Sequence, residues 1–396
     1  MALSRRDAWP VAVVAMLTMT VSYVDRQTFN VLAPTITKEL DISETGFGLL
    51  GSAFSFAYLF ATPLSGWWIE RIGARRGLLA SVATWSGIAA LHALVPGFGM
   101  LLALRLGLAF AEGPSFPGAT QTMLRALSPE DRSRGFGLLF TGSSLGSMIA
   151  APLATRLSDD YGWRVAVLVT AAIGLSWIPM WLAVTSRRGV AEQLDTPPVD
   201  VESGPRPRFR DMMKHPSVVR AVVAILAVAP TTAFWLVWGS KFLVRTYGMK
   251  QGKVGGYLWL PPLCLDLGAI VFGDLFARTR RPRMLAVIAM LMAMCSALVP
   301  FTDTPWTSIA VGSIMIAGGG ALYTVVTADV MTRVPPDSVS VVGGLIAAGQ
   351  SLALIIVSPF VGRLVETYQS YDVVLWGIAV WIVPGMLVWL LWKPTK

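Results

Sequence analysis

The chain carries the sequence FGLLGSAFSFAYLFATPLSGWWIERIGARR at Phe47–Arg76. From Phe47 to Trp68 this stretch contains no charged residue. It is long enough to cross a hydrocarbon core of ~30 Å, which takes about 20 residues of helix. Charged residues begin at Glu70 and end the apolar run. The pattern predicts a transmembrane helix followed by a short polar loop.

The rest of the chain repeats this pattern and predicts an all-α integral membrane protein with about twelve transmembrane helices. Hydrophobic residues make up 54% of the sequence and charged residues 14%, whereas an average soluble protein has about 25% charged residues. A large soluble helical bundle is therefore disfavoured. The other apolar runs are Trp9–Pro34, Gly77–Val95, Gly99–Leu124, Gly135–Arg156, Arg164–Val184, Val218–Phe242, Val254–Phe276, Met284–Phe301, Thr307–Met331, Val341–Val361 and Val373–Trp392.

One long polar stretch, at 186–216, interrupts the apolar runs and has the same number of them on each side. Because it is rich in charge and proline, it cannot bury a core, and it is predicted to be a cytoplasmic linker. It would join a six-helix bundle at residues 1–185 to a second at residues 217–396. Its prolines are Pro197, Pro198, Pro205, Pro207 and Pro216.

A weak internal repeat supports two related halves. Gly66–Arg76 (GWWIERIGARR) and Gly273–Arg283 (GDLFARTRRPR) both have a glycine, four residues and an arginine at the end of the second span of a half. The alternative is that any cytoplasmic helix end collects arginines. Secondary transporters are often built from such repeats, with the substrate site near the bilayer midplane.

Basic residues gather in the loops after spans two, four, six, eight and ten. Positive loops mark the cytoplasmic side, so we expect both termini in the cytoplasm and the protein in the inner membrane. The loop after span seven, which contains Arg245, Lys250 and Lys253, is an exception. Because the net charge of +9 lies largely in such loops, it does not indicate a nucleic-acid partner. We expect a monomer in the lipid bilayer.

Four ionisable residues lie inside two spans, where each costs at least ~2.5–3.5 kcal/mol on insertion scales. They are Asp25 and Arg26 in the first span and Arg105 and Glu112 in the fourth. Arg105 and Glu112 are nearly two helical turns apart, about 10 Å, on one face.

These charges suggest a mechanism of proton coupling. Burial favours the neutral form of a carboxylic acid, so Asp25 and Glu112 are the predicted proton-coupling residues. Arg26 and Arg105 stay charged and can hold a carboxylate through parallel N–H donors. An anion beside Arg105 would weaken its hold on Glu112. The alternative is that Asp25–Arg26 and Arg105–Glu112 are static ion pairs.

Further polar residues within spans are candidates for substrate binding. Tyr23 and Tyr58 can donate hydrogen bonds, although packing explains Tyr58 equally well. The small residues of Gly142–Gly146 (GSSLG) favour close helix packing, but Ser143 and Ser144 could also face substrate hydroxyl groups. The second half adds Trp238, Lys241 and Asp266, together with Asp329, which is either functional or a structural tie at a helix end.

A different role is predicted for Gly66, Glu70, Arg71 and Arg75 at the end of span two. These residues lie near water, so their charges cost little. They can pair with a neighbouring helix in one conformation and release it in another, which is a gating role.

The sequence contains no pattern typical of an enzyme or an ATP-driven pump. It has no GxxxxGK[S/T], GxSxG, HExxH or CxxC motif, and these motifs carry phosphate-binding, nucleophilic or metal chemistry. Cys264 and Cys295 lie in apolar runs, and His92 and His215 are isolated. We expect no catalytic activity, no cofactor, no disulfide and no metal site.

The stretch Gly66–Arg76 resembles the loop signature between helices two and three of the major facilitator superfamily. Together with the six-plus-six layout, this resemblance implies two pseudo-symmetric six-helix bundles that rock around a central cavity.

A closer resemblance covers nearly the whole chain and points to the anion:cation symporter branch, especially its hexuronate transporters. The pair Trp238 and Lys241 fits this branch. So do SYVDRQ at Ser22–Gln27, LRLGLAFAEGPSFP at Leu104–Pro117, TGSSLGSMIAAPL at Thr141–Leu153, YGWR at Tyr161–Arg164 and LPPLCLDLG at Leu260–Gly268.

This resemblance implies symport of protons with a sugar acid such as a hexuronate or aldonate. It implies proton sites at Asp25 and Glu112 and substrate binding or coupling at Arg26 and Arg105. It also implies cavity positions at Tyr23, Tyr58 and Gln350. The sequence departs from the branch at Ala109 and Pro114, which affects the expected cavity shape, and at Ala277 in the second copy of the loop signature.

Two other functions remain open. Spinster-type facilitators resemble this chain in the Asp-Arg pair of helix one and in the Arg and Glu of helix four, so efflux of a lipid-like or drug-like molecule is a second hypothesis. The Trp–Lys pattern of helix seven and the Asp-Leu-Gly of helix eight favour the sugar-acid branch. The third hypothesis is a membrane receptor that binds a ligand without moving it. The direction of transport is open as well.

Overall fold

The computed structural model describes residues 3–195, 209–335 and 338–392, and these residues form helices and no strands. Eleven helices in this part of the chain are long and apolar enough to cross a membrane. The predicted fourth span is not among them because it divides into α5 (Phe98–Glu112) and α6 (Ser115–Ala126). Pro114 and Pro117 interrupt its backbone hydrogen bonds there. Eleven spans plus this bent one give the twelve that the sequence predicts.

The described residues form two compact units. Each unit is built mainly from one half of the chain, but each also contains one short segment from the other half. Residues 43–52, at the start of α3 (Glu44–Ile72), belong to the second unit, and α13 (Gln251–Leu258) belongs to the first. The first unit falls within Met1–Ile42, Ala53–Val201 and Lys250–Trp259, and the second within Ser43–Ser52, Glu202–Met249 and Leu260–Lys396.

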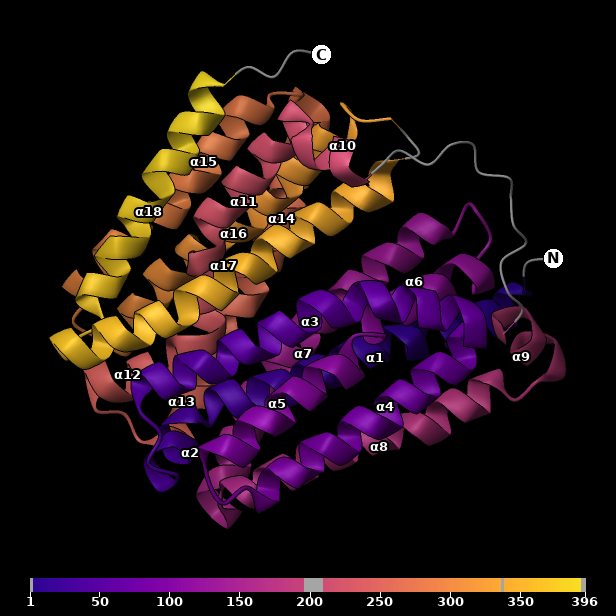
Figure 1. Cartoon of the computed structure of the whole chain (residues 1–396), viewed down its shortest axis with the longest axis horizontal. Coiled ribbons are helices and arrows are strands. Elements are labelled where there is room, and N and C mark those ends of the chain that lie inside the picture. The colour runs from indigo at the N-terminus through magenta and orange to yellow at the C-terminus, as the bar shows by residue number, and fades with distance from the viewer. Residues whose placement is uncertain (1–2, 196–208, 336–337, 393–396) are drawn as a thin grey trace. The chain divides into compact units, whose positions relative to one another are not determined.

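The first unit is built around α1 (Arg5–Val31), which packs against α6, α7 and α8. The helices α4 and α8 run side by side next to it (Figure 1). The other elements of this unit are α2 (Ala33–Glu39), most of α3, α4 (Ala74–Leu91) with its 3₁₀ turn His92–Leu94, α7 (Arg132–Tyr161), α8 (Trp163–Thr185), α9 (Arg188–Asp195) and α13.

Glycines allow α7 to approach α1 closely. A Cβ atom at Gly142 would lie 2.7 Å from the carbonyl oxygen of Met16, and one at Gly146 would collide with the carbonyl oxygen of Thr20. These contacts support the packing explanation of the GSSLG segment. On another face of α1, Trp177 of α8 donates its indole N–H to the carbonyl oxygen of Val14 at 2.8 Å.

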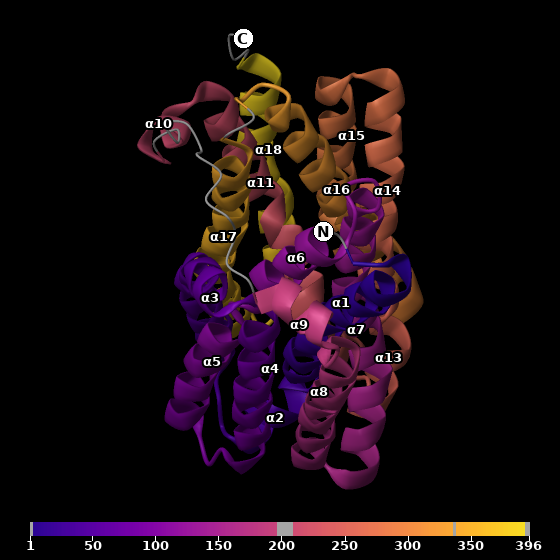
Figure 2. The same cartoon turned by 90° about the vertical axis from the view of Figure 1, so that its right-hand side faces the viewer.

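The second unit is organised around α16 (Pro305–Met331), which packs along α14 (Leu260–Thr279) and beside α15 (Pro282–Met294) (Figure 2). The helix α11 (Pro216–Ala233) packs against α16, α17 and α18. The remaining elements are α10 (Phe209–Lys214), a π-helical turn Phe234–Trp238, α12 (Gly239–Tyr247), a 3₁₀ turn Cys295–Phe301, α17 (Val339–Tyr368) and α18 (Asp372–Leu391).

The predicted linker is partly helical. It contains α9 and α10, whereas residues 196–208, with Pro197, Pro198, Pro205 and Pro207, lie outside the described residues. The helix α9 is amphipathic and buries Val190 and Leu194 in the core of the first unit. This part of the linker therefore contributes to a core, in contrast to the expectation from its composition.

Candidate functional site

The four predicted ionisable residues lie in the first unit, on α1 and α5. Asp25, Arg105 and Glu112 are 6%, 3% and 0% exposed, and Arg26 is half-buried. Charges at such positions are costly, so they are usually paired with another group or retained for a function. The partners of each group therefore decide which of them are structural.

Arg26 and Glu112 form the ion pair of this site. The Nε atom of Arg26 donates to Oε2 of Glu112, and the hydroxyl of Ser22 donates to the same oxygen at 3.2 Å. The pair ties α1 to α5. It corrects the expected scheme in which Arg105 holds Glu112, because Arg26 takes that place in the described part of the chain.

Arg105 has unused hydrogen-bond donors. Among the described residues, its Nε and Nη1 atoms have no hydrogen-bond partner. Its guanidinium carbon lies 4.3 Å from the ring centre of Phe29 and 4.6 Å from that of Phe54. Aromatic faces stabilise a cation without using its N–H donors. Arg105 is therefore equipped to receive a carboxylate from a ligand.

Arg26 lies against the same aromatic group. Its guanidinium carbon is 4.4 Å from the ring centre of Tyr58, 4.9 Å from that of Phe54 and 5.1 Å from that of Tyr23. Phe54 thus contacts both arginines, and it stacks on Tyr58 with ring centres 5.9 Å apart. The two predicted cavity tyrosines lie beside a predicted substrate-binding arginine.

Asp25 is placed differently from Glu112. Neither of its carboxylate oxygens has a hydrogen-bond partner of ordinary length among the described residues. The indole N–H of Trp85 is likewise buried without a partner of ordinary length in this part of the chain. Asp25 lines a small cavity with His92 and Arg105. It has no ion pair with Arg26.

The predicted serines are engaged mainly with their own helix. The hydroxyl of Ser143 donates to the carbonyl oxygen of Phe140 at 2.9 Å, and its carbonyl accepts from Ser147 at 3.0 Å. Ser144 is buried. Neither contact adds to the cluster of charges on α1 and α5.

In the second unit, Lys241 already has an acidic partner. Its Nζ atom lies 3.1 Å from Oε2 of Glu44 and 5.3 Å from the ring centre of Phe47. Trp238 meets the same Phe47 ring edge-on at 4.9 Å between ring centres. Any anion that binds Lys241 therefore competes with Glu44. The other two predicted residues, Asp266 and Gln350, are half-buried on α14 and α17.

Asp329 is held by two arginines. One carboxylate oxygen accepts from Nη2 of Arg220 at 2.9 Å, and the other accepts from Nη2 of Arg333 at 2.8 Å. The guanidinium of Arg220 also stacks 4.0 Å over the ring of Trp389. This full set of partners supports the structural explanation of Asp329.

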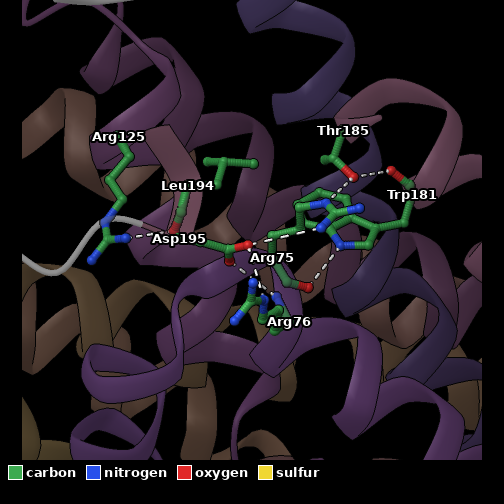
Figure 3. A network of polar contacts seen from close by, with 7 residues as sticks. All are labelled: Arg75, Arg76, Arg125, Trp181, Thr185, Leu194 and Asp195. Atoms are coloured by element: carbon green, nitrogen blue, oxygen red, sulfur yellow. Dashed lines mark hydrogen bonds and ion pairs between the residues drawn. The ribbon is translucent and has the colours of Figure 1, made fainter. Parts of the chain in front are cut away.

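The predicted gating residue Arg75 is held within its own unit (Figure 3). Its Nε atom donates to Thr185 at 3.1 Å, and its Nη1 lies 3.8 Å from Oδ2 of Asp195 on α9. Arg76 lies 3.4 Å from the same oxygen. Arg125 donates to the carbonyl of Leu194 at 2.5 Å. The helix α9 is therefore fastened to arginines of the loop signature.

The other predicted gating residues are more open. Glu70 and Arg71 are exposed, and Gly66 is half-buried with open space beside its Cα. The guanidinium of Arg71 stacks 3.8 Å over the ring of Trp67.

Glu39 of α2 is fixed by two donors of α8. It accepts hydrogen bonds from Arg164 and, at 2.6 Å, from Nε1 of Trp163. These hydrogen bonds lower the pKa of Glu39 below its ordinary value, and the hydrogen bond from Arg164 has the larger effect.

Sequence reasoning missed several of these partners. Ser22 and Phe54 are ordinary residues of apolar spans and carry no charge that marks them. Glu44 and Asp195 are charged residues near helix ends, where such residues are common. In the described part of the chain, no group of His, Cys, Asp and Glu could hold a metal ion.

Residues 15–358 match the model of the Major Facilitator Superfamily. The hexuronate transporter of Bacillus subtilis (strain 168) is 25% identical over 394 residues, which are 95% of this chain and 93% of that protein. The probable galactarate/D-glucarate transporter GudP of the same strain is 22% identical over 97% of this chain and 91% of that protein.

Solved structures share the fold at low identity. A bacterial homolog of the human lysosomal transporter Spinster, inward-facing and unoccupied, has a TM-score of 0.81 at 17% identity and covers 99% of this chain and 100% of its own. The nucleoside transporter NupG has a TM-score of 0.78 at 13% identity and covers 97% of this chain and 99% of its own.

Proposed function

The chain belongs to the Major Facilitator Superfamily, and from this premise we propose that it carries a small organic anion, a hexuronate or related sugar acid, together with protons. It is a multi-pass membrane transporter and not an enzyme. Relatives named as hexuronate and galactarate/D-glucarate transporters support the substrate class. We propose that it works as a monomer in the inner membrane.

The observation that carries the proposal is the unequal use of two neighbouring arginines. Arg26 is neutralised by the fully buried Glu112. Arg105 is equally buried but keeps two unpartnered N–H donors among the described residues. A buried guanidinium with free donors favours a bound carboxylate, because charge-assisted hydrogen bonds are strong where water is excluded.

The position of Glu112 supports proton coupling. When Glu112 takes up a proton, it loses its attraction for Arg26, and the site gains one positive charge. A monovalent anion beside Arg105 and Arg26 restores the original charge. Protonation of Glu112 therefore favours binding of the anion, and the bound anion in turn favours protonation of Glu112.

The remaining predicted residues have supporting roles. The phenol groups of Tyr23 and Tyr58 beside Arg26 can donate hydrogen bonds to sugar hydroxyl groups. Ser143, Ser144, Trp238, Lys241, Asp266 and Gln350 stay proposed substrate-binding residues. For Lys241 this role means that the substrate carboxylate competes with Glu44.

The test is uptake into proteoliposomes under an imposed inward proton gradient. The panel contains glucuronate, galacturonate, galactonate, lactate and a lipophilic dye. We expect gradient-stimulated uptake of a sugar acid that a protonophore abolishes. Accumulation of the dye alone would instead support the second hypothesis, efflux of a lipid-like or drug-like molecule. Binding of an acid without any uptake would support a receptor.

Two variants test the roles of the charged pair. Glu112→Gln should lose stimulation by the gradient and keep counterflow exchange, which needs no net proton movement. The exposed Glu130→Gln is the matched control and should behave as wild type. Arg105→Ala should weaken acid binding about tenfold or more, because a hydrogen bond to a charged group contributes ~1.5–3 kcal/mol. Normal acid binding by Arg105→Ala would remove Arg105 from the substrate site.

A further inference from the structure

A small cavity lies inside the first unit beside Asp25. Its walls come from α1, α2, α4 with its following turn, α5 and α8. It offers about 20 Å³ to the centres of water molecules, and a single water needs about 10–15 Å³ measured in this way. The cavity can therefore hold water.

The walls of this cavity carry buried polar atoms that lack hydrogen-bond partners in the described part of the chain. These atoms are both carboxylate oxygens of Asp25, Oγ1 of Thr28, Nε2 of His92, and Nε and Nη1 of Arg105. Native proteins leave few such atoms unsatisfied. Acceptors from Asp25 and His92 and donors from Arg105 match the two to four partners that a buried water needs.

His92 is oriented for proton transfer. Its Nδ1 lies 2.9 Å from the carbonyl oxygen of Ile88. Because a carbonyl only accepts, Nδ1 donates, and the neutral ring presents Nε2 as an acceptor. The side chain is 5% exposed and lines the cavity. His92 can thus take a proton at Nε2 and pass it on from the same atom.

The cavity lies towards one end of the first unit. His92 follows the last residue of α4, a helix of 18 residues whose first turn carries Arg75. At 1.5 Å per residue this helix is about 27 Å long. Trp163, another wall residue, is the first residue of α8 and donates to the half-exposed Glu39. The route from Asp25 through His92 therefore leads away from the arginine-rich end.

We propose that His92 and cavity water form the path by which a proton reaches Asp25 from the extracytoplasmic side, a route separate from the Arg26–Glu112 pair. This inference rests on the proton coupling proposed above. His92 accepts a proton at Nε2 from water that enters at the Trp163 end, and the hydroxide left behind returns to that end. Another water then takes its place beside Nε2, receives the proton from Nε2 and gives a proton to the Asp25 carboxylate. The ring returns to its neutral form, and no bond other than these O–H and N–H bonds changes.

The charges around His92 shorten the lifetime of its protonated form. The charged wall residues are Asp25 on α1 and Arg105 on α5, whereas α2 and α8 contribute Ile36, Trp163, Val167 and Thr170. The positive charge of Arg105 repels an imidazolium, and the carboxylate of Asp25 attracts the proton onward. This arrangement suits a relay and not a site of lasting protonation.

The experiment compares His92→Asn with His215→Asn in proteoliposomes. Asparagine can keep the hydrogen bond to the Ile88 carbonyl but cannot carry a proton. His215, the other histidine of the chain, lies outside the cavity walls and serves as the matched control. For the acid with the largest uptake in the panel above, the initial rate is measured with an inward proton gradient, and counterflow is measured at equal pH.

We expect His92→Asn to slow gradient-driven uptake about tenfold or more, since a positioned proton-transfer group contributes at least about a hundredfold in enzymes. Counterflow should stay at the wild-type rate, and His215→Asn should match wild type in both measurements. His92→Gln, which places its amide near the position of Nε2, should show the same split between driven uptake and counterflow.

Three results would overturn the inference, and they differ from one another. Gradient-driven uptake of His92→Asn at the wild-type rate would remove the relay and leave the proposed function intact. Loss of counterflow in both His92 variants would show that His92 only supports the fold. If the wild-type protein itself shows counterflow but its uptake does not respond to the proton gradient, proton coupling is refuted, and the route to Asp25 is refuted with it.

Discussion

At the level of single residues, the buried charges of this transporter fall into two kinds. Asp329 has two arginine partners within 3 Å, so its charge is fully compensated. Asp25 and Arg105 are as deeply buried, but they have unpartnered polar atoms among the described residues. A compensated charge stabilises one conformation, whereas an uncompensated one is maintained at a cost and indicates binding or proton exchange.

The structural role of a compensated charge can be tested by removing one partner of its ion pair. Asp329→Asn leaves Arg220, which is 2% exposed, without its counter-charge, and breaking a buried pair costs about 3–5 kcal/mol. Thermal unfolding of the purified protein in detergent should show this loss. Asp274→Asn breaks the exposed pair with Arg278 and should cost at most about 1 kcal/mol. Equal melting temperatures for both variants would contradict the distinction.

Glu39 gives a pH dependence with a definite sign. Its pKa is lowered in the folded protein by the hydrogen bonds from Arg164 and Trp163. The ionised group therefore stabilises the fold above its unfolded pKa of about 4.3, and this effect is lost as pH falls through the lower folded pKa. The gap in melting temperature between wild type and Glu39→Gln should be present at pH 7 and close in acid. A gap that does not change with pH would exclude this origin.

At the level of helices, close contacts of small residues position the site. The glycines of α7 sit on carbonyl oxygens of α1, and α1 carries Ser22, Asp25 and Arg26. Any change in the spacing of these two helices shifts Arg26 relative to Glu112 on α5. The packing of α7 therefore affects the ion pair without touching it.

Two glycines of α7 allow a matched test. At Gly146 a new Cβ would collide with the backbone of Thr20, whereas at Gly137 it would meet nothing within 4 Å. Gly146→Ala should cost about 1–3 kcal/mol from overpacking. Gly137→Ala should be neutral or stabilise by up to about 1 kcal/mol, because alanine restricts the unfolded chain. Unfolding midpoints in detergent measure both, and a stable Gly146→Ala protein would disprove the tight contact.

The docking of α9 shows where sequence reasoning fails at this scale. Its eight residues lie at the beginning of a polar stretch that is too charged and too rich in proline to predict a packed element. The helix is held by Arg75, Arg76 and Arg125, which come from two other parts of the chain. A single sequence does not show which distant arginines will converge on Asp195.

At the level of the whole molecule, hydrophobic run length alone predicted the twelve spans. The candidate site was predicted as a set of residues but not as a set of contacts. The exchange of partners at Glu112 depends on the relative register of α1 and α5. Packing sets that register, and it cannot be predicted from the hydropathy of either helix.

Orientation in the membrane is a prediction for the molecule as a whole. The arginine-rich helix ends predict that both termini lie in the cytoplasm. A green fluorescent protein fused to the C-terminus should fluoresce, and an alkaline phosphatase fused there should be inactive. A phosphatase fusion that ends in the loop after α4, near Gly97, should be active as the control. The reverse pattern of activities would invert the predicted topology.

The long sequence separation of the Arg26–Glu112 pair has a consequence for biogenesis. The two residues are 86 positions apart, and ribosomes add about 5–20 residues per second. The first helix therefore enters the bilayer with a charged side chain whose counter-ion has not yet been synthesised and arrives roughly 4–17 s later. During that interval Arg26 depends on lipid headgroups, water or the insertion machinery to compensate its charge.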